Sequence, residues 1–363
     1  MTIYNRLEKL RYLEPKKSVL VIFNEFLRKV DKVLGRDRLL SSPTSLQLEC
    51  TTKCNLRCLM CDSPIWDRRG MDMSFSDFKR IIDQFPCLVT LNLQGMGEPL
   101  LNKDIFEMIA YCKSKKIMVF FTTNATLIDE KIAKKIVDSG LDYLVVSVDG
   151  ATPETFEKIR AGAKFDQVIE NIKRVVAEKK KKKSEKPRIV VHFCASEDNI
   201  EELPQVLKLA KEFGAVELEV GNILFWGKDY LREKLSDKKI ALNIDRAKKI
   251  INETKRDADR LGIDFFWLGN KMNKVFTDRD LRLHADPRLC RQPFRSCFVT
   301  VDGYITYCSD IADPRITNFG NILTEDFRDI WNNPDYRDLR RSFLKGKIPK
   351  LCRECTKPVS IDS

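Results

Sequence analysis

Histidine is almost absent from this sequence, which holds only His192 and His284 among its 363 residues. So few histidines argue against a zinc site with both imidazole and thiolate ligands. Long apolar runs are missing too, because none approaches the roughly 20 residues that a helix needs to cross a bilayer. Met1 to Lys17 is too charged for a secretory signal, since no apolar segment follows its basic residues. These absences argue against a membrane-spanning or secreted protein.

Cysteine and positive charge are what the chain has instead. Twelve cysteines without signs of export indicate a reducing cytoplasm and thiols that bind metal rather than form disulfides. A net charge of +12 could attract nucleic acid, an acidic membrane surface or an anionic substrate. Part of that charge is the lysine run Lys179 to Lys183, which has no interleaved aromatic residues to stack on bases. We therefore expect a solvated loop there and no nucleic-acid binding.

Three thiols lie within eight residues, at Cys54, Cys58 and Cys61, in the spacing C-x3-C-x2-C. Closely spaced thiolates on a loop are typical ligands of iron–sulfur clusters. Zinc sites more often show two separated C-x2-C pairs, and three thiols cannot all pair in disulfides. Three cysteines would hold three irons of a 4Fe–4S cluster and leave the fourth iron open to a small chelating ligand.

This motif, placed just after the apolar stretch Ser45 to Glu49, resembles the signature of radical S-adenosylmethionine (SAM) enzymes. The resemblance implies that SAM chelates the open iron and is cleaved reductively to a 5′-deoxyadenosyl radical. That radical abstracts a hydrogen atom from the substrate. Met60, which stands where the family often has an aromatic residue, is expected to contact SAM.

Apolar strand candidates alternate with helical patterns from about residue 45 to 225. Such β–α units predict parallel strands with right-handed crossovers, in a barrel or an open sheet. The family resemblance selects a partial (β/α)6 TIM-like barrel, with the chemistry at the C-terminal ends of its strands. The expected strands are Ser45–Cys50, Leu88–Gln94, Ile117–Thr122, Tyr143–Val148, Arg188–Cys194 and Val216–Asn222. The expected helices are Phe75–Gln84, Ile105–Lys115, Glu130–Ser139, Asp166–Glu178 and Glu202–Phe213.

Polar motifs follow three of these strands. Gly97 and Glu98 belong to G-M-G-E-P, where glycine allows close backbone approach and a carboxylate can accept from an ammonium group. This motif resembles the family's GGEP segment, which binds the amino group of SAM. Asn124, in T-T-N-A, and Ser147, in S-V-D-G, resemble further SAM contacts. Arg160 could pair with the SAM carboxylate, or form a surface ion pair with Glu154 or Glu157.

A second set of cysteines lies near the C-terminus: Cys290, Cys308, Cys352 and Cys355. The segment between the first two predicts a hairpin over residues 298–307, with Asp302-Gly303 in a type I′ turn. A helical pattern over Asp326–Phe343 leads to the final C-x2-C pair. The set resembles the SPASM and twitch auxiliary domains, and the shorter twitch form fits best. The resemblance implies one 4Fe–4S cluster with four thiolate ligands; a zinc ribbon is the alternative.

Three further features are a lone thiol, two residues of one strand and an N-terminal apolar pattern. Cys297 is expected to be a small buried residue, with ligation or acid–base chemistry as alternatives. Cys194 could face the site. His192 is two residues earlier on the same strand and would lie on the same face, although a hydrogen-bonded core histidine is the simpler interpretation. Apolar residues at helical spacing between Val19 and Val33 predict a helix packed on the barrel wall, or else docking on a membrane or a partner.

Together these patterns predict an α/β fold of one large and one small domain. The expected segments are an N-terminal helical segment (1–44), the barrel (45–227), a helical bridge (228–285) and an α+β auxiliary-cluster domain (286–363). The expected function is net oxidation of a small molecule such as a sugar or aminocyclitol. One alternative is maturation of a ribosomal peptide, although 44 N-terminal residues are fewer than we expect for a leader-peptide-binding domain. The other is a non-catalytic electron carrier. Flavodoxin or ferredoxin is the expected reductant.

Overall fold

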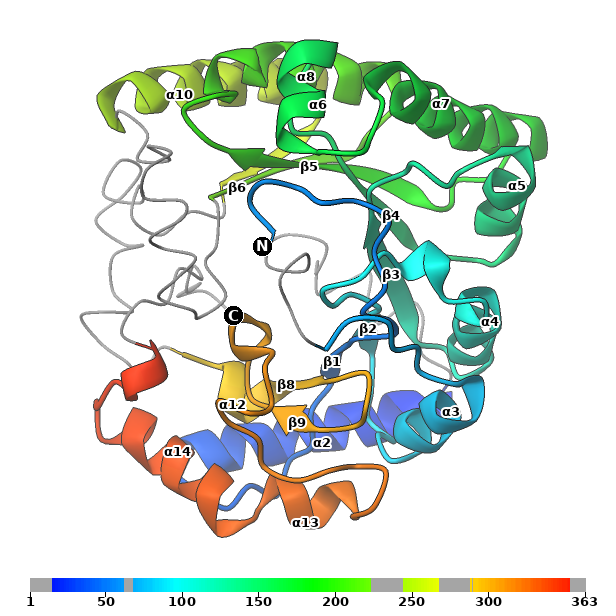
Figure 1. The fold of residues 1–363 in the computed structure, drawn as a ribbon. Helices are drawn as coiled ribbons and strands as arrows, with labels where there is room; N and C mark the ends of the chain where they lie inside the picture. Colours follow the sequence, from blue (N-terminus) through cyan, green and yellow to red (C-terminus); the bar gives the residue numbers. More distant parts are fainter. Residues whose placement is uncertain (1–14, 62–67, 223–243, 268–287, 289, 353–363) are drawn as a thin grey trace.

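The strands of the protein form one curved sheet. The computed structural model describes residues 15–61, 68–222, 244–267, 288 and 290–352. In these ranges nine strands pair in the order β7-β6-β5-β4-β3-β2-β1-β8-β9. All neighbours are parallel except β8 and β9. Figure 1 shows the sheet curving inside an outer layer of helices. The predicted barrel-like α/β fold is therefore confirmed.

The first six strands lie where the sequence predicts them. Two further strands extend the parallel sheet at its two sides: β7, within the stretch expected to be a helical bridge, and β8, which pairs with β1. The strands are β1 (Ser45–Leu48), β2 (Thr90–Asn92), β3 (Met118–Thr123), β4 (Tyr143–Ser147), β5 (Arg188–Ala195), β6 (Glu217–Asn222), β7 (Asp264–Trp267), β8 (Ser296–Val299) and β9 (Ile305–Thr306).

Helices follow the strands along the chain, and several begin at capping residues. Ser74, Asp129 and Thr152 each accept a hydrogen bond from a backbone amide in the first turn of the helix that follows. The helices are α2 (Pro15–Val33), α3 (Phe75–Asp83), α4 (Ile105–Ser114), α5 (Glu130–Asp138), α6 (Pro153–Ile159), α7 (Phe165–Lys182), α8 (Leu203–Glu212), α10 (Ile244–Leu261), α12 (Gln292–Arg295), α13 (Phe327–Trp331) and α14 (Pro334–Leu344). In the described ranges, none has the length and apolarity needed to cross a bilayer.

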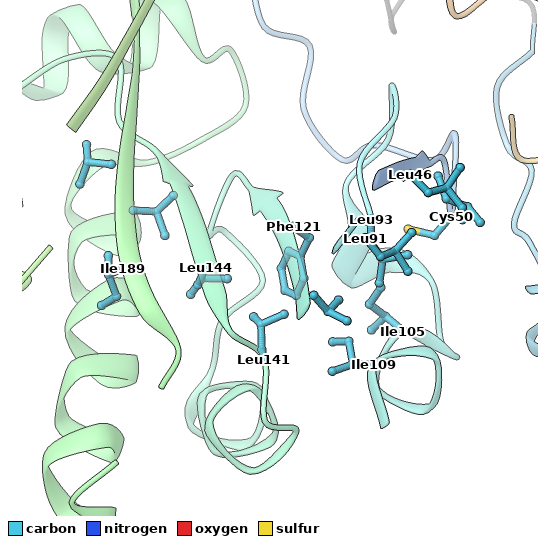
Figure 2. Packing of buried hydrophobic residues seen from close by; sticks show 14 of the residues in the cluster. Leu46, Cys50, Leu91, Leu93, Ile105, Ile109, Phe121, Leu141, Leu144 and Ile189 are labelled. Carbon is cyan, nitrogen blue, oxygen red and sulfur yellow. The ribbon is translucent and has the colours of Figure 1, made fainter. Parts of the chain in front are cut away.

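The main core lies between the outer face of the sheet and the helices. Alternate strand residues such as Leu46, Leu91 and Phe121 meet Ile105 and Ile109 of α4 in this layer (Figure 2). Because side chains alternate across a strand, every second residue of these strands enters the core. Burying one such aliphatic side chain stabilises the fold by about 1.5–3 kcal/mol.

The opposite face of the sheet lines the inside of the barrel and changes character along the strands. Met118, Phe120 and Val145 form an apolar cluster toward the N-terminal ends of β3 and β4. Further along the same faces come Thr122 and Ser147, near the C-terminal ends. The fold therefore places polar groups where the cysteine loop also begins.

Two predictions for the C-terminal part are wrong in detail. The helix expected over Asp326–Phe343 is divided into α13 and α14, because Asn333 caps a new helix whose first residue, Pro334, has no amide hydrogen to donate. The hairpin turn is not type I′: among its residues only Gly303 has a positive φ, at 86°, and its amide donates to Thr300 O. Asp302 keeps an ordinary backbone conformation, since only glycine adopts the left-handed region without strain.

Helix α2 forms, but the expected packing of its apolar residues on the barrel wall is wrong. Val19, Phe23 and Phe26 are exposed, whereas the polar residues Asn24 and Asp31 are buried. The helix turns its polar side toward the protein and its apolar side toward solvent.

Candidate functional site

The cysteine loop begins directly after β1 and is held in place by backbone hydrogen bonds. The amides of Arg57 and Leu59 donate to the carbonyls of Ala161 and Ile159, at the C-terminal end of α6, at 3.0 and 2.9 Å. Leu56, between the first two cysteines, is buried in the core. The loop is therefore anchored to the C-terminal end of the barrel rather than free in solvent.

Cys54, Cys58, Met60 and Cys61 are each partly buried on this loop. Burial raises the pKa of the Cys54 and Cys58 thiols, and the Arg160 guanidinium opposes that shift. Among the described residues, no three thiols, imidazoles or carboxylates converge on one point that could hold a single metal ion. Closely spaced thiolates on one loop are typical ligands of an iron–sulfur cluster, in which each thiolate binds a separate iron.

Gly97 brings the G-M-G-E-P segment against the cysteine loop. A Cβ atom at this position would lie 2.4 Å from Thr51 O and 2.7 Å from Lys53 O. The next amide, that of Glu98, donates to Lys53 O at 2.7 Å. Only glycine allows this approach of two backbones. The two predicted motifs are therefore in direct contact.

The carboxylate of Glu98 is buried and accepts three hydrogen bonds from the protein. Its donors are the Thr123 hydroxyl and the Asn124 amide, both at 2.8 Å, and the Leu100 amide at 3.2 Å. Burial raises the pKa of this carboxyl, while those hydrogen bonds lower it. Glu98 thus ties the loop after β2 to the end of β3, and its predicted contact with the amino group of SAM stays a prediction.

Asn124 is predicted to contact SAM, and it also reaches the cysteine loop. Its Nδ2 donates to Asn55 Oδ1 at 3.0 Å. The following residue, Ala125, has a φ of 58°, in the left-handed region that favours glycine. This explains why glycine suits the motif that T-T-N-A resembles; alanine there costs on the order of 1–2 kcal/mol.

Ser147 and Arg160 lie near the end of β4, and Arg160 is paired inside the protein. Arg160 Nε donates to Asp149 Oδ2 at 2.6 Å, and both residues are buried. The alternative of a surface ion pair with Glu154 or Glu157 is wrong. Burial works against the charge on Arg160, but the Asp149 carboxylate more than offsets it, so the pKa is raised. None of the described residues accepts a hydrogen bond from its Nη groups.

Cys194 and His192 both lie on the inner face of β5. Cys194 is close enough to Cys58, Cys61 and Arg160 for their charges to influence its pKa, which burial raises. His192 pairs in register with Ser147 and is half-buried. Its imidazole makes no hydrogen bond to any described residue, so the simpler interpretation of a hydrogen-bonded core histidine is wrong.

The sequence analysis did not identify Glu49, which links the barrel to the C-terminal hairpin. Its buried carboxylate accepts from the amides of Met96, in the G-M-G-E-P segment, and Val301, at 3.1 and 3.2 Å. Gly95 is required beside it, since a Cβ there would lie 2.3 Å from Glu49 Cγ. The sequence feature that could have identified Glu49 is a glutamate directly after an apolar strand. Glu49 therefore holds three parts of the site together.

Replacing Glu49 by glutamine is expected to flatten the pH dependence of stability. Burial raises the pKa of Glu49 to about 7 from an ordinary 4.5, although two amides and Arg68 oppose the shift. The folded chain holds this proton more tightly than the unfolded chain, so the free energy of unfolding falls as pH rises from about 4.5 to 7. That loss is about 3 kcal/mol. Urea unfolding of both proteins across this range measures it; an unchanged slope in Glu49→Gln would contradict this assignment.

The second cysteine set gathers around Tyr307. The thiol of Cys352 lies 3.0 Å from the Tyr307 hydroxyl, and the charges of Cys352, Cys308 and Cys290 all raise the Tyr307 pKa, after burial. Three of the four predicted ligands are therefore neighbours, and the fourth, Cys355, lies outside the described residues. Cys297 belongs to the main core and pairs in register with Leu46, on the helix-covered face, as expected for a small buried residue.

Two family models match the chain. The radical SAM superfamily matches residues 48–210, and the iron–sulfur cluster-binding SPASM domain matches residues 290–356. The first contains the cysteine loop and the motifs after β2, β3 and β4. The second contains the four cysteines of the second set.

Similar proteins match most of the length of the chain. The tungsten-containing aldehyde ferredoxin oxidoreductase cofactor-modifying protein of Pyrococcus furiosus is 24% identical over 86% of both chains. The AdoMet-dependent heme synthase of Methanosarcina barkeri is 28% identical over 87% of this chain and 91% of its own. The PqqA peptide cyclase of Gluconobacter oxydans is 24% identical over 87% of this chain and 83% of its own.

Among solved structures, SuiB of Streptococcus suis shares this fold. Its complex with S-adenosylmethionine superposes with a TM-score of 0.69 at 18% identity, covering 86% of this chain and 70% of SuiB. A second SuiB structure, bound to the precursor peptide SuiA, gives a TM-score of 0.67 at the same identity and coverage. The chain is therefore a radical SAM enzyme, with a SAM-binding 4Fe–4S cluster and an auxiliary-cluster domain, and it belongs to the SPASM branch of the radical SAM superfamily.

Proposed function

We propose that this enzyme modifies a peptide substrate by hydrogen-atom abstraction. The observation that carries the proposal is the similarity to the PqqA peptide cyclase over most of both chains. The SuiB fold, solved with a precursor peptide, supports it. These relatives favour a peptide over the sugar or aminocyclitol substrate expected from the sequence. The similarity to the heme synthase favours an iron porphyrin as substrate instead.

The cysteine loop and its neighbours are proposed to form the SAM site. Cys54, Cys58 and Cys61 would hold the catalytic cluster, which with SAM bound supplies the 5′-deoxyadenosyl radical. Arg160 is close enough to Cys58 for their charges to interact. Its Nη groups would receive the SAM carboxylate, because a guanidinium binds carboxylates with two parallel hydrogen bonds. Met60, Gly97, Glu98, Asn124 and Ser147 would surround the rest of the molecule.

The inner wall of the barrel would meet the substrate. His192 and Cys194 project from the same face of β5, on the side of the sheet where the cysteine loop lies. Glu219 of β6 pairs in register with His192 and adds a carboxylate. A net two-electron oxidation needs one hydrogen atom removed by the adenosyl radical, one proton removed by a base and one electron removed by an acceptor. His192 would accept the proton.

The electron would pass to the auxiliary cluster held by Cys290, Cys308, Cys352 and Cys355. Four thiolates leave no open iron, so this cluster suits electron transfer better than substrate chelation. An external reductant such as flavodoxin or ferredoxin would start each turnover, and a cytoplasmic location would keep both clusters reduced and intact.

The test is anaerobic incubation of the cluster-loaded enzyme with SAM, dithionite and short peptides encoded beside its gene. We expect one peptide to bind, to raise 5′-deoxyadenosine formation and to lose a pair of hydrogen atoms by mass spectrometry. His192→Gln should keep SAM cleavage but lower peptide product by on the order of 10²-fold, as for loss of a positioned base. Iron porphyrins serve as the competing substrates, and their turnover in place of any peptide would reject the proposal. Loaded clusters without SAM cleavage under dithionite would instead indicate a non-catalytic electron carrier.

A further inference from the structure

Helix α2 attaches to the protein through its polar side. The Asn24 side chain exchanges hydrogen bonds with the backbone of Ser42, at 2.7 and 3.0 Å. The buried Asp31 carboxylate accepts from the amides of Leu40 and Ser41 and from the Ser41 hydroxyl. Lys17 Nζ donates to the backbone at the end of α4. These contacts fix one side of the helix, and the apolar residues on its other side are exposed.

That apolar side is a continuous stripe on the outside of the molecule. Val33 is 83% exposed, Val19 67% and Ile22 59%, and Phe23 and Phe26 are also exposed, with their rings stacked on each other. Eight of the eleven large apolar side chains that are exposed in the described residues lie between residues 19 and 40. Contiguous apolar surface of this kind marks an interaction site.

The stripe lies at the end of the barrel opposite the cysteine loop. Every contact of α2 named above is with residues that precede a strand: Ser42 precedes β1, and Lys115 and Lys116 precede β3. The Cys87 thiol, which contacts Leu20 O, precedes β2. The cysteine loop follows the other end of β1. A surface bound to α2 would therefore leave the catalytic end free.

Exposed lysines also lie at this end of the barrel. Helix α7 runs back from the catalytic end and finishes at Lys182, just before β5, so the run Lys179 to Lys183 lies here. The loop expected for this run is therefore wrong, since its first four lysines form the last turn of α7. Lys180 and Lys183 are exposed and have no ion-pair partner among the described residues. Lys29 and Lys32 add exposed charge on α2. The acidic residues of α2 offset little of this exposed positive charge, because Asp31 is buried and Glu25 pairs with Arg28.

We propose that this end of the barrel docks on an anionic lipid surface, with the α2 stripe inserted at the level of the headgroups. A basic helix with a phenylalanine-containing apolar stripe is typical of helices that lie in a membrane interface. Each lysine near an anionic bilayer adds attraction of its own. A protein partner or a second copy would have to complement both the stripe and a cationic end, whereas an anionic bilayer supplies both properties. This inference does not depend on the proposed substrate.

The test is sedimentation of the cluster-loaded full chain, under anaerobic conditions, with vesicles of phosphatidylcholine alone or mixed with phosphatidylglycerol. We expect at least tenfold stronger binding to the mixed vesicles, weakened by salt. Ile22→Ser/Phe26→Ser should lower that binding on the order of tenfold or more. Lys180→Glu/Lys183→Glu should lower it roughly tenfold. The matched controls are Ile316→Ser, an exposed apolar residue of the C-terminal part, and Lys158→Glu, near the catalytic end; both should bind as wild type.

Three results would overturn the proposal. One is absence of binding to the mixed vesicles. Another is binding that Ile22→Ser/Phe26→Ser leaves unchanged. The third is sedimentation velocity showing a dimer that the same double variant converts to a monomer, without vesicle binding, which would make the stripe a contact between copies. All variants are checked for wild-type iron content, which should hold because the substituted side chains are exposed.

Discussion

Replacing Cys54, Cys58 and Cys61 together by alanine is expected to lower the iron content from about eight to about four per chain, because each 4Fe–4S cluster contributes four irons. The same variant should form no 5′-deoxyadenosine under dithionite. The loop itself should persist, since its anchors are Leu56 and the backbone bonds of Arg57 and Leu59 rather than the thiols. Iron and sulfide analysis after anaerobic reconstitution, with chromatography of the SAM products, measures both effects.

Two further variants separate the clusters from each other. Cys308→Ala/Cys352→Ala should also lose about four irons but still cleave SAM, because its cysteine loop is intact. Cys297→Ala is the matched control: it removes a buried thiol from the same region, but one that faces the helix-covered core, so iron should stay near eight. About four irons or fewer in wild type, with zinc present, would make the C-terminal cysteines structural, and the proposed net oxidation would lose its electron acceptor.

The barrel could be predicted from the sequence because the apolar residues of its strands are also the residues that are buried in the fold. In β3 and β4, for example, Val119, Phe121 and Leu144 enter the outer core while Met118 and Tyr143 fill the inside. Strands apolar on both faces give uninterrupted apolar runs, which are readily recognised between amphipathic helices. Spacing alone identified both cysteine sets, and the ligand roles of their thiols stay predictions.

The parts that could not be predicted depend on long-range contacts. The side of α2 that faces the protein follows from hydrogen bonds to residues 40–44, not from the helix's own periodicity. The strand β7 is only four residues long and pairs with β6 alone among the described residues. Glu49 and Asp149 are buried carboxylates whose hydrogen-bond partners are not their sequence neighbours. Glu49 accepts from Met96 and Val301, and Asp149 accepts from Arg160. A carboxylate at the end of an apolar strand is the signal that both share.

Neutralising Asp149 is expected to destabilise the fold strongly. Asp149→Asn would leave the buried Arg160 guanidinium without its 2.6 Å partner. Removing one member of a buried ion pair typically costs about 3–5 kcal/mol of the free energy of unfolding. Lys158→Gln, which removes one member of an exposed pair with Asp198, should cost less than about 1 kcal/mol. Denaturant unfolding of matched samples measures both.

The double variant Asp149→Asn/Arg160→Gln then separates structural stability from SAM binding. With both charges gone, most of the lost stability should return, because no unpaired charge remains in the interior. SAM binding should not return, since the guanidinium proposed to receive its carboxylate is absent, and a lost charge-assisted pair weakens binding by about tenfold or more. Calorimetric titration of the cluster-loaded proteins gives the ratio of dissociation constants. If the double variant binds SAM as wild type does, Arg160 serves only to neutralise Asp149, and the orientation of SAM against the cluster must come from the loops after β2 and β3.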